Sequence, residues 1–531
     1  DKLRRPKSAL RVGAACYLAV LAGTALGQDD QESAEDRLKR MERRMDAILR
    51  EVEQLRGDVA KTQRAVPSKQ LETEVTELKG QVAEVKEQAA ATDAKADQAG
   101  VRAYLGPGLV FEDPRGRWRL QVSGRAQGDF RAYTPDFANA NTFSIRRARM
   151  GLSATVLDDY GVFVEEEFAN QNTNPSTATA TPILTFAYVD FNWFRPGIRF
   201  RAGQFKPFIG LDNTMLDLQT DFMERAFTQN LFGSLVYDRG VMTFGEPVQG
   251  LFYSAAVTNG TGQAIDESQS NLQEAESDGK DYTVRVVNNF AQTFGLDNTV
   301  LHFGGTYKRG SAVNSPTIPY RASSVQTEAR GLTFFIPAAF DSAGANVSNI
   351  NRTIVDWEGA LAYKSYKIQG DYAEVRYSGT TSSPGAPVDF ARTLKAAYVT
   401  LGWVLTGESY SDFYREGTFV RPRPRNNFAW REAGAWGLWE LNARYSWFDG
   451  SSFNAGNPVN TGRPGSSANF PNITQGTNKA QALTLGLKWQ PNLYTRIVLN
   501  LIHTKFDTPV VVNGKTTDYE NAITTRAQID F

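Results

Sequence analysis

From residue 117 onward, hydrophobic and polar positions alternate along the chain with a period of two. The chain ends in TTRAQIDF, in which Ala527, Ile529 and Phe531 share one parity and polar residues take the positions between them. The stretches RWRLQVSGRAQGDF, GLWELNARYSW and ALTLGLKW repeat this arrangement. Because successive side chains of a β-strand point to opposite faces, each stretch predicts a strand with one apolar face and one polar face.

The alternation predicts sixteen strands, most of them about ten residues long, which is the length that a tilted strand needs to cross a bilayer. The expected strands are 118–130, 143–156, 161–168, 185–194, 199–205, 239–245, 251–258, 281–289, 299–308, 353–363, 366–377, 391–406, 435–447, 479–489, 495–506 and 523–531. The mean hydropathy is −0.40 and no run of about 20 apolar residues occurs, which excludes a helical span but not a barrel of alternating strands. We therefore predict an all-β transmembrane barrel of 16 antiparallel strands.

The connections between these strands alternate between short and long. Short turns such as LDDYG, RPG, GEPVQ and QPNL contrast with the long segments 169–184, 206–238, 259–280 and 309–352. Outer-membrane barrels combine tight periplasmic turns and long external loops in this way. Residues 407–434 break the rule, because they should form a periplasmic turn but are far too long. We expect this segment to fold into the barrel mouth.

A soluble β-sandwich is the alternative explanation of the alternation. It would not need the aromatic residues that gather at strand ends in DFNWF and YSWF, where they suit a membrane interface. The terminal Phe531 also favours the barrel, because outer-membrane barrels present such an ending to their assembly machinery. The expected location is therefore the bacterial outer membrane.

Residues 1–27 differ from the rest of the chain. The basic start DKLRRPKSALR, the apolar core VGAACYLAVLAGTAL and small residues before Gln28 indicate a secretory signal peptide. An N-terminal anchor helix is the alternative, disfavoured by the short apolar core. Because the chain opens on Asp1, we expect the natural start to lie upstream. Cys16 is the only cysteine and lies within that core, so the exported protein is expected to contain no disulfide.

Residues 28–100 have a helical period instead. Apolar residues recur at alternating steps of three and four from Leu38 to Val66, Pro67 interrupts them, and the pattern restarts at Leu71. We predict two parallel coiled-coil segments in the periplasm, which require partner helices and therefore an oligomer. An amphipathic helix on a membrane surface is the alternative, although its apolar stripe would be wider. The barrel domain is expected to span residues 101–531.

The composition excludes several functions. The 531 residues include 58 basic and 58 acidic side chains, and this neutrality argues against a nucleic-acid partner. The two histidines, His302 and His503, lie far apart in predicted strands, and no cysteine or histidine cluster has the spacing of metal ligands. We expect no catalytic residues, no metal and no cofactor.

If the apolar parity faces lipid, the opposite parity faces the lumen. Ten arginines have this inward parity, namely Arg119, Arg125, Arg147, Arg149, Arg199, Arg201, Arg285, Arg444, Arg496 and Arg526. Guanidinium groups stay charged and bind phosphate oxygens bidentately, so a row of them offers a passing anion successive sites. The alternative is structural: inward carboxylates such as Glu165, Asp371 and Glu440 would pair with the arginines and stiffen the wall.

Five stretches of the chain resemble one known family when taken together and in order. They are FSIRRARMGLSATVLDDYGVFVEEEF (143–168), AYVDFNWF (187–194), RFRAGQFKPFIGLDN (199–213), DFMERAF (221–227) and GAWGLWELNARYSWFD (434–449). This combination is similar to the phosphate-selective porin O/P family of outer-membrane channels, from about residue 110 to the end. The resemblance implies a trimer of sixteen-stranded barrels, each with a pore narrowed by inward-folded loops and lined by arginines that lead to basic anion-binding residues.

The resemblance also identifies FKPFIGLDN and DFMERAF with the family's constriction loop, and 407–434 with its inward-folding periplasmic turn. Further candidates for anion binding lie in or next to these segments: Lys206, Arg225, Arg239, Arg421, Arg423 and Arg425. We expect a trimeric porin for passive diffusion of small hydrophilic solutes, with a preference for anions and with phosphate or pyrophosphate as candidate solutes. The alternative is a general porin whose coiled coil also tethers the envelope to the cell wall. Outer-membrane lipid and small anions are the other expected partners.

Overall fold

The computed structural model describes residues 100–106, 108–169, 182–232, 237–260, 262, 280–313, 320, 322–337, 340, 349–381, 388–453 and 473–531. The signal peptide and the coiled coil predicted for residues 1–27 and 28–100 therefore lie outside the described residues, apart from Gly100. Packing divides the chain into two compact units, of which the smaller includes residues 100–104 and 110–120. In this smaller unit Tyr104 donates a hydrogen bond to Glu112 over 3.0 Å, and Arg117 pairs with Asp113. The barrel unit contains residues 121–531 together with residues 105, 106, 108 and 109.

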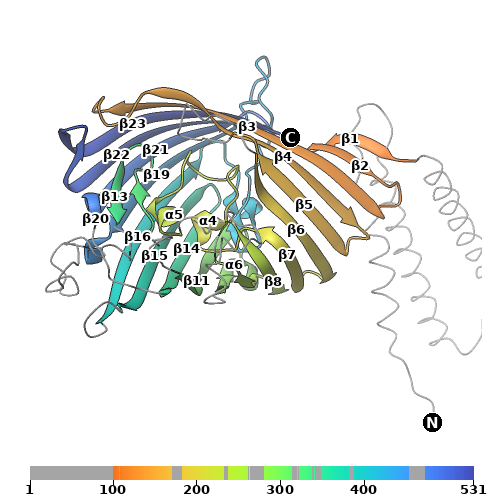
Figure 1. Ribbon diagram of the computed structural model, residues 1–531. Helices are drawn as coiled ribbons and strands as arrows, with labels where there is room; N and C mark the ends of the chain where they lie inside the picture. The colour runs from red at the N-terminus through yellow and green to blue at the C-terminus, as the bar shows by residue number, and fades with distance from the viewer. Residues whose placement is uncertain are drawn as a thin grey trace, which may run out of the picture. The chain divides into compact units, whose positions relative to one another are not determined.

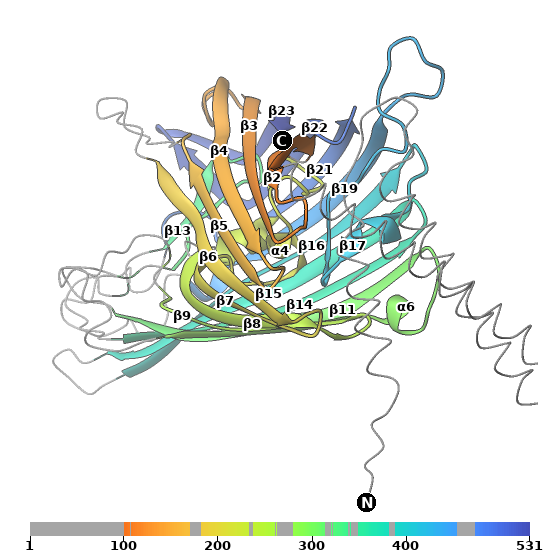
Figure 2. The ribbon, with the colours of Figure 1, turned by 90° about the vertical axis from the view of Figure 1, so that its right-hand side faces the viewer.

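Sixteen antiparallel strands form a closed barrel (Figures 1 and 2). They are β3 (Trp118–Thr134), β4 (Thr142–Val156), β5 (Tyr160–Glu167), β6 (Ile183–Phe194), β7 (Ile198–Phe205), β8 (Asp238–Val248), β9 (Leu251–Thr258), β10 (Asp281–Asn289), β11 (Thr299–Val313), β14 (Asn349–Tyr363), β15 (Tyr366–Thr381), β16 (Val388–Val404), β19 (Leu438–Asp449), β21 (Lys479–Gln490), β22 (Thr495–Val512) and β23 (Lys515–Asp530). Strands pair in chain order, and β23 closes the barrel by pairing with β3 from Asn521–Thr134 to Asp530–Arg125. All sixteen predicted strands are confirmed. The short strands β1 (Arg102–Gly106) and β2 (Gly108–Glu112) precede them.

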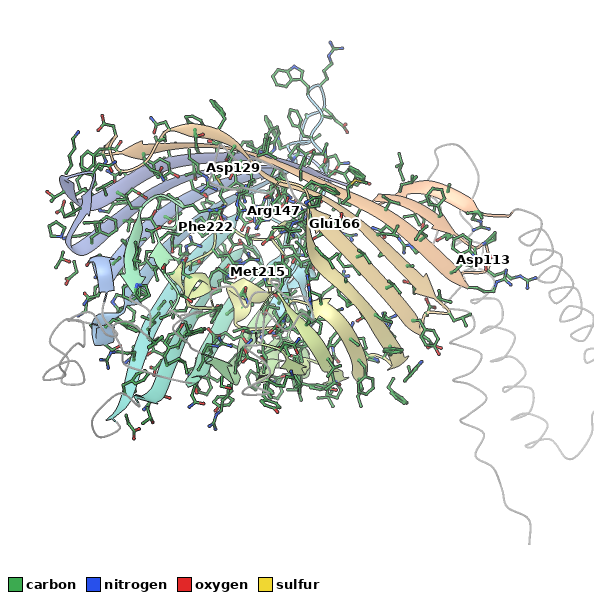
Figure 3. The ribbon with its side chains drawn as sticks, in the orientation of Figure 1. Asp113, Asp129, Arg147, Glu166, Met215 and Phe222 are labelled. Atoms are coloured by element: carbon green, nitrogen blue, oxygen red, sulfur yellow. The ribbon has the colours of Figure 1, made fainter. Side chains whose placement is uncertain are left out.

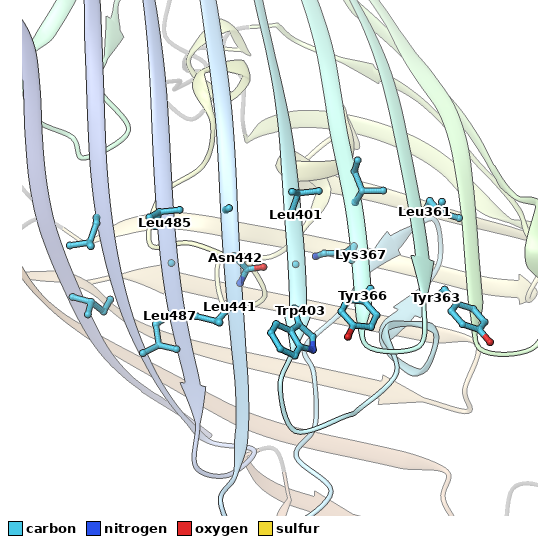
Figure 4. Close-up of a pocket in the computed structure, with 16 residues that line it drawn as sticks. Leu361, Tyr363, Tyr366, Lys367, Leu401, Trp403, Leu441, Asn442, Leu485 and Leu487 are labelled. Carbon is cyan, nitrogen blue, oxygen red and sulfur yellow. The ribbon is translucent and has the colours of Figure 1, made fainter.

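Burial alternates along the strands as the sequence predicts. In β23 the side chains of Thr524, Arg526 and Gln528 are buried, whereas Ile523 and Ile529 are exposed on the outer face. The outer face of β14 to β22 carries rows of leucines, and Tyr366 and Trp403 stack at the strand ends with ring centroids 5.8 Å apart (Figure 4). An apolar outer face with aromatic rings at its edge matches the hydrocarbon core and interface of a bilayer.

The two ends of the barrel differ in their connections. One end holds the C-terminus and the short turns at 157–159, 195–197, 249–250, 364–365 and 491–494, and we call it the C-terminal mouth. The segment 290–298 at this end carries the short helix α6 (Phe290–Thr293). Residues 405–437, which we call the inner turn, also connect strands here and contain η4 (Tyr410–Phe413), β17 (Tyr414–Arg415) and β18 (Thr418–Phe419). The predicted short turns are therefore found at this end, with the inner turn as the exception, whereas at the opposite end only Asn513 and Gly514 join β22 to β23.

The lumen of the barrel is occupied by two folded parts of the chain. Residues 206–237, which we call the crossing segment, carry the helices α4 (Leu211–Thr214) and α5 (Phe227–Phe232). A small sheet of β12 (Val325–Gln326), β13 (Thr333–Pro337) and β20 (Ile473–Gly476) lies beside α5 in the structure (Figure 1), in agreement with the ring contacts described below.

An apolar core holds these inner parts against one wall. Phe227 of α5 and Phe334 of β13 lie with ring centroids 5.6 Å apart, and both contact Phe448 of β19. The inward side chains beneath them are apolar as well, as with Val375 and Leu394, which have no exposed surface. The outward neighbours of Val375 and Leu394 are polar, as with Glu374 and Lys395, which form a partly exposed ion pair 3.8 Å apart. On this part of the wall the apolar side chains therefore face inward, and they form the base of a folded core.

The described residues contain no helix that combines the length and apolar character of a membrane span.

Barrel closure depends on close contact between the last residue and a glycine. The backbone N–H of Gly124 donates to the Phe531 oxygen over 2.9 Å, and the Phe531 N–H donates to the Gly124 oxygen over 3.0 Å. A Cβ atom at Gly124 would lie 2.4 Å from Cζ of the Phe531 ring, whereas a Cβ at Gly128 on the same strand would meet nothing within 4 Å.

We predict that Gly124→Val destabilises the closed barrel by about 1–3 kcal/mol, because the added side chain must displace the Phe531 ring. Gly128→Val, on the same strand and the same face, is the matched control and should change stability little. The temperature at which the folded barrel unfolds in detergent gels measures both. Equal effects of the two substitutions would contradict this role of the Phe531 contact.

Candidate functional site

The crossing segment spans the lumen from one wall to the other. The Gly210 N–H donates to Thr306 of β11 over 3.2 Å, and the Asp212 N–H donates to Asp371 of β15 over 3.1 Å. Further along, the Met223 N–H donates to Asn500 of β22 over 2.9 Å. Because these contacts reach strands on different sides of the barrel, the segment narrows any path through it. Met215 and Phe222 of this segment, both labelled in Figure 3, are buried.

Three carboxylates of the crossing segment bind cationic side chains of the wall. Glu224 is within 2.7 Å of Arg131, 3.0 Å of Arg146 and 2.9 Å of Arg526. These three arginines belong to β3, β4 and β23, the strands at the closure of the barrel. One carboxylate therefore neutralises part of a cluster drawn from three strands.

Asp217 and Asp221 make equivalent contacts elsewhere. Asp217 lies 3.0 Å from Arg147 and 2.6 Å from Arg225, the latter within the crossing segment itself. Asp221 lies 2.9 Å from Lys367 of β15 and 3.8 Å from Lys488 of β21. The segment is thus held by ion pairs on opposite parts of the wall.

These carboxyl groups remain ionised despite their burial. Burial opposes ionisation of Glu224, but Arg146, Arg131 and Arg526 outweigh it and hold its pKa well below the usual range. For Asp217, burial is likewise outweighed by the neighbouring arginines, led by Arg147, so that its pKa also lies well below the usual range. The ion pairs that attach the crossing segment to the wall are therefore fully formed at neutral pH.

Most of the inward arginines predicted from the sequence are paired with carboxylates. Arg149 lies 2.9 Å from Glu165 and 2.7 Å from Glu167. The same holds for Arg125 with Glu165 at 3.8 Å, Arg199 with Glu416 at 2.9 Å, Arg201 with Asp190 at 2.7 Å, Arg285 with Glu358 at 2.6 Å, Arg444 with Glu328 at 2.6 Å and Arg526 with Asp129 at 2.7 Å. The alternative stated in the sequence analysis, that inward carboxylates pair with the arginines and stiffen the wall, therefore describes much of the barrel.

The other predicted residues fall into different environments. Arg119 lies exposed in the smaller unit, outside the barrel unit. Arg239 of β8 donates to Gln204 over 3.0 Å. Arg496 is buried and donates to the backbone oxygens of Leu218 and Thr220 in the crossing segment, each over 2.9 Å.

The inner turn folds back against the wall at the C-terminal mouth, as expected for 407–434. Tyr414 forms a 2.6 Å hydrogen bond with His302 of β11, and Arg285 donates to the Gly417 oxygen over 2.7 Å. Arg421 pairs with Asp530 of β23, and Arg425 donates to the Gly407 oxygen over 2.7 Å. Arg423 is exposed there and has no ion pair or hydrogen bond with the described residues.

Lys206 is the cation of the crossing segment that lacks a partner among the described residues. It is buried, and its surroundings include Arg225 and Arg147 as well as Asp217 and Asp212. Burial and the field of Arg225, followed by that of Arg147, hold the pKa of Lys206 well below the usual range, although Asp217 and Asp212 act in the opposite direction. This part of the lumen is therefore short of negative charge, and a bound anion would stabilise the ammonium form.

Several charged residues of the lumen were missed by the sequence analysis. Counting back from the inward Arg147 gives Arg146 outward parity, yet Arg146 contacts Glu224 in the lumen. The reason is that the alternation of inward and outward side chains, counted from the exposed Phe143, shifts between these two arginines of β4. Arg131 lies one residue beyond the end of the strand predicted for 118–130. Lys367 and Lys488 have inward parity in their predicted strands, so alternation could have identified them as lumenal cations. Arg330 belongs to a long connection, so no periodicity pointed to it. Burial lowers its pKa to about 10, opposed by Glu224.

The opposite wall carries carboxylates without a cationic partner. Asp356 of β14 has no hydrogen-bond partner for either carboxylate oxygen among the described residues, and Asp371 of β15 accepts only the N–H of Asp212. Within the described residues, no group of three or more histidine, cysteine, aspartate or glutamate side chains could hold a metal ion. The lumen therefore has cation-rich and carboxylate-rich sides.

We predict that Glu224→Gln loosens the crossing segment. Removing one partner of a buried ionic cluster costs about 3–5 kcal/mol, because the remaining charges stay buried and unpaired. Single-channel recordings should then show more frequent current fluctuations than the wild type, whereas the control Glu166→Gln, which removes a carboxylate of β5 outside this cluster, should not.

The same attachment predicts a pH dependence. Because the folded pKa of Glu224 is depressed, its stabilising contribution is complete above the unfolded value of about 4.5 and is lost as pH falls through the depressed folded pKa. The frequency of current fluctuations in wild-type recordings should therefore be equal at pH 7 and pH 5 and rise only in stronger acid. Quiet Glu224→Gln channels, or wild-type noise that begins near neutral pH, would contradict this account.

The comparison with known structures gives low-identity matches, among them an outer membrane channel, a porin and an outer membrane protein. The outer membrane channel DcaP of Acinetobacter baumannii is 12% identical, covers 78% of this chain and 97% of its own, and has a TM-score of 0.43. The anion-selective porin from Comamonas acidovorans is 9% identical, with 78% and 100% coverage and a TM-score of 0.43. OmpT of Vibrio cholerae is 11% identical, with 78% and 99% coverage and a TM-score of 0.41. No curated protein sequence matches the chain.

A family model gives the stronger result. The model described as phosphate-selective porin O and P matches residues 120–531, which include the whole barrel from the first residues of β3 to the C-terminus. The family predicted from five sequence stretches is thus confirmed over most of the chain. The closed barrel, its apolar outer face and its charged lumen agree with this match: the chain belongs to the phosphate-selective porin O and P family.

Proposed function

We propose that this outer-membrane porin prefers anions and passes small hydrophilic solutes by diffusion through the narrowed lumen of each barrel. The observation that supports the preference most directly is Lys206, a buried lysine without a carboxylate partner among the described residues, near Arg225 and Arg147. Arg330 and Arg423 also lack ion pairs with described residues. A passing anion is attracted to such unpaired cations, whereas an arginine that is already paired with a carboxylate attracts the anion much less.

The pairing of the wall arginines limits how strong this preference can be. Each carboxylate that binds a wall arginine removes an attractive site for anions and adds a local barrier. Phosphate or pyrophosphate remains the proposed solute because guanidinium and ammonium groups bind phosphate oxygens well.

We predict that Lys206→Gln lowers the chloride-to-potassium permeability ratio at least about twofold. The reversal potential of the purified protein in a planar bilayer under a KCl gradient measures this ratio. Lys395→Gln is the matched control, because Lys395 lies on β16, its side chain is 43% exposed and its neighbours Leu394 and Ala396 face inward. A cation-selective wild type, or equal effects of both substitutions, would overturn the proposal.

The wild-type ratio should also depend on alkaline pH. Because the pKa of Lys206 is lowered, the group loses its charge as pH rises through a value below the usual 10.5. The anion preference should therefore decline at a pH at which ordinary lysines remain charged, and Lys206→Gln should abolish this decline. Titrating the chloride current with phosphate in the same recordings tests phosphate selectivity, for which block at micromolar phosphate is expected.

We further propose that the mature protein is a homotrimer joined by the heptad segments in residues 28–100. The support is the apolar seam from Leu38 to Val66, which needs partner helices. Because a strand barrel with an even number of strands returns its last strand to the side on which it began, the C-terminal mouth and the coiled coil are proposed to face the periplasm. The envelope tether remains the second proposed role of this segment.

Deleting residues 29–100 separates the two roles of the coiled coil. If the segment is an assembly device, the trimer should dissociate at a lower temperature while conductance per barrel and envelope integrity survive. If it is a tether, cells should become sensitive to detergent while conductance survives. Unchanged trimer stability together with an intact envelope would contradict both roles.

A further inference from the structure

The C-terminal mouth contains a cavity of about 620 Å³ that is larger than an inorganic anion requires. Its walls come from β3 to β5, the crossing segment, the inner turn and the turn between β21 and β22. All of these parts belong to the barrel unit. Pockets for organic ligands typically have volumes of about 300–1,000 Å³.

Unused guanidinium donors line this cavity. Arg421 pairs with Asp530, yet its Nε and Nη2 atoms are buried and have no hydrogen-bond partner among the described residues. Arg125 lies 3.8 Å from Glu165, and its Nε atom is also buried without a partner in this part of the structure. Asp530 and Glu165 fix the two guanidinium groups while leaving donors available. A carboxylate is a planar acceptor that matches such donors bidentately.

Apolar side chains form another part of the same lining. Phe413 and Val420 come from the inner turn, Leu218 from the crossing segment and Leu493 from the turn before β22. The Val420 N–H donates to the Phe413 oxygen over 2.6 Å, so the fold of the inner turn places these two residues together. A phosphate ion would leave these side chains in contact with water, whereas a solute with a hydrocarbon body would cover them.

We infer that this cavity is a binding site for carboxylate solutes with an apolar body, such as aromatic acids. The inference rests on the proposed anion channel and gives it a second solute class. Arg421 and Arg125 bind the carboxylate, and Phe413, Val420 and Leu218 contact the body of the solute. The inner turn supplies both kinds of contact, which accounts for a connection at this mouth that is far longer than closure of the barrel requires.

The test uses the full mature chain in planar bilayers, with benzoate, acetate or inorganic phosphate added at the C-terminal mouth at constant ionic strength and pH 7. Acetate carries the same carboxylate without the ring, so the comparison isolates the apolar contribution. Benzoate should halve the KCl current at a concentration at least tenfold lower than acetate.

Three substitutions assign the block to this cavity. Arg421→Gln and Arg125→Gln should each raise the benzoate concentration for half block, the former about tenfold. Val420→Thr, which nearly keeps the shape of the side chain, should reduce the difference between benzoate and acetate about threefold without changing block by phosphate. Arg392→Gln is the matched control, because Arg392 is buried in β16 outside this cavity and its only hydrogen bond among the described residues is to the Ala391 oxygen.

Two results would overturn the inference: benzoate that blocks no better than acetate, or Arg421→Gln and Arg125→Gln channels that match Arg392→Gln. Calorimetric titration of the detergent-solubilised protein with benzoate separates this inference from the channel proposal. A cation-selective channel that still binds benzoate and loses that binding in Arg421→Gln would refute the proposed anion preference alone. An anion-selective channel without benzoate binding would refute only the site proposed here.

Discussion

Charge neutralisation inside a closed wall is the constraint on which the rest of this structure depends. A barrel whose outer face meets lipid must place its charged side chains inward, where they are withdrawn from bulk water. The arginines of β3, β4 and β23 gather where the barrel closes, and an uncompensated cluster of this kind would repel itself. Glu224 and Asp217 of the crossing segment supply the opposite charges. The segment that narrows the lumen is therefore also the segment that allows the cationic wall to exist.

This constraint links the stability of the barrel to its transport properties. A porin with a bare row of arginines would attract anions strongly along its whole length. Here most of those side chains are paired, so the anion preference that we propose depends on the few cations without carboxylate partners among the described residues, such as Lys206 in the crossing segment and Arg423 at the C-terminal mouth. Membership of the family alone does not predict which cations are paired and which are not, because the pairing depends on which carboxylates the inward-folded segments carry.

The sequence predicted the strands well because lipid imposes a strict period on the outer face. Ile523, Ile529 and their counterparts could be assigned from alternation alone, and the inward parity of Arg526 and Arg149 followed from it. The resemblance to the family added the inward folding of two connections. These predictions share a local cause, since each depends on neighbouring residues or on a short motif.

The contents of the lumen could not be predicted in the same way. Val375 and Leu394 are inward and apolar because β13 and α5 pack on them, and no feature of β15 or β16 reveals those distant partners. Arg146 escaped notice because the alternation shifts within β4, and Arg330 because its connection has no period. Pairing between Asp221 and Lys367 joins residues 146 positions apart, which alternation cannot detect.

Cryo-electron microscopy of the mature protein in lipid nanodiscs tests the central claim most directly. The account predicts density for residues 206–232 inside a sixteen-stranded barrel, with the Glu224 carboxylate between the guanidinium groups of Arg131, Arg146 and Arg526. A barrel whose crossing segment lies outside the lumen, with those arginines facing open water, would contradict it.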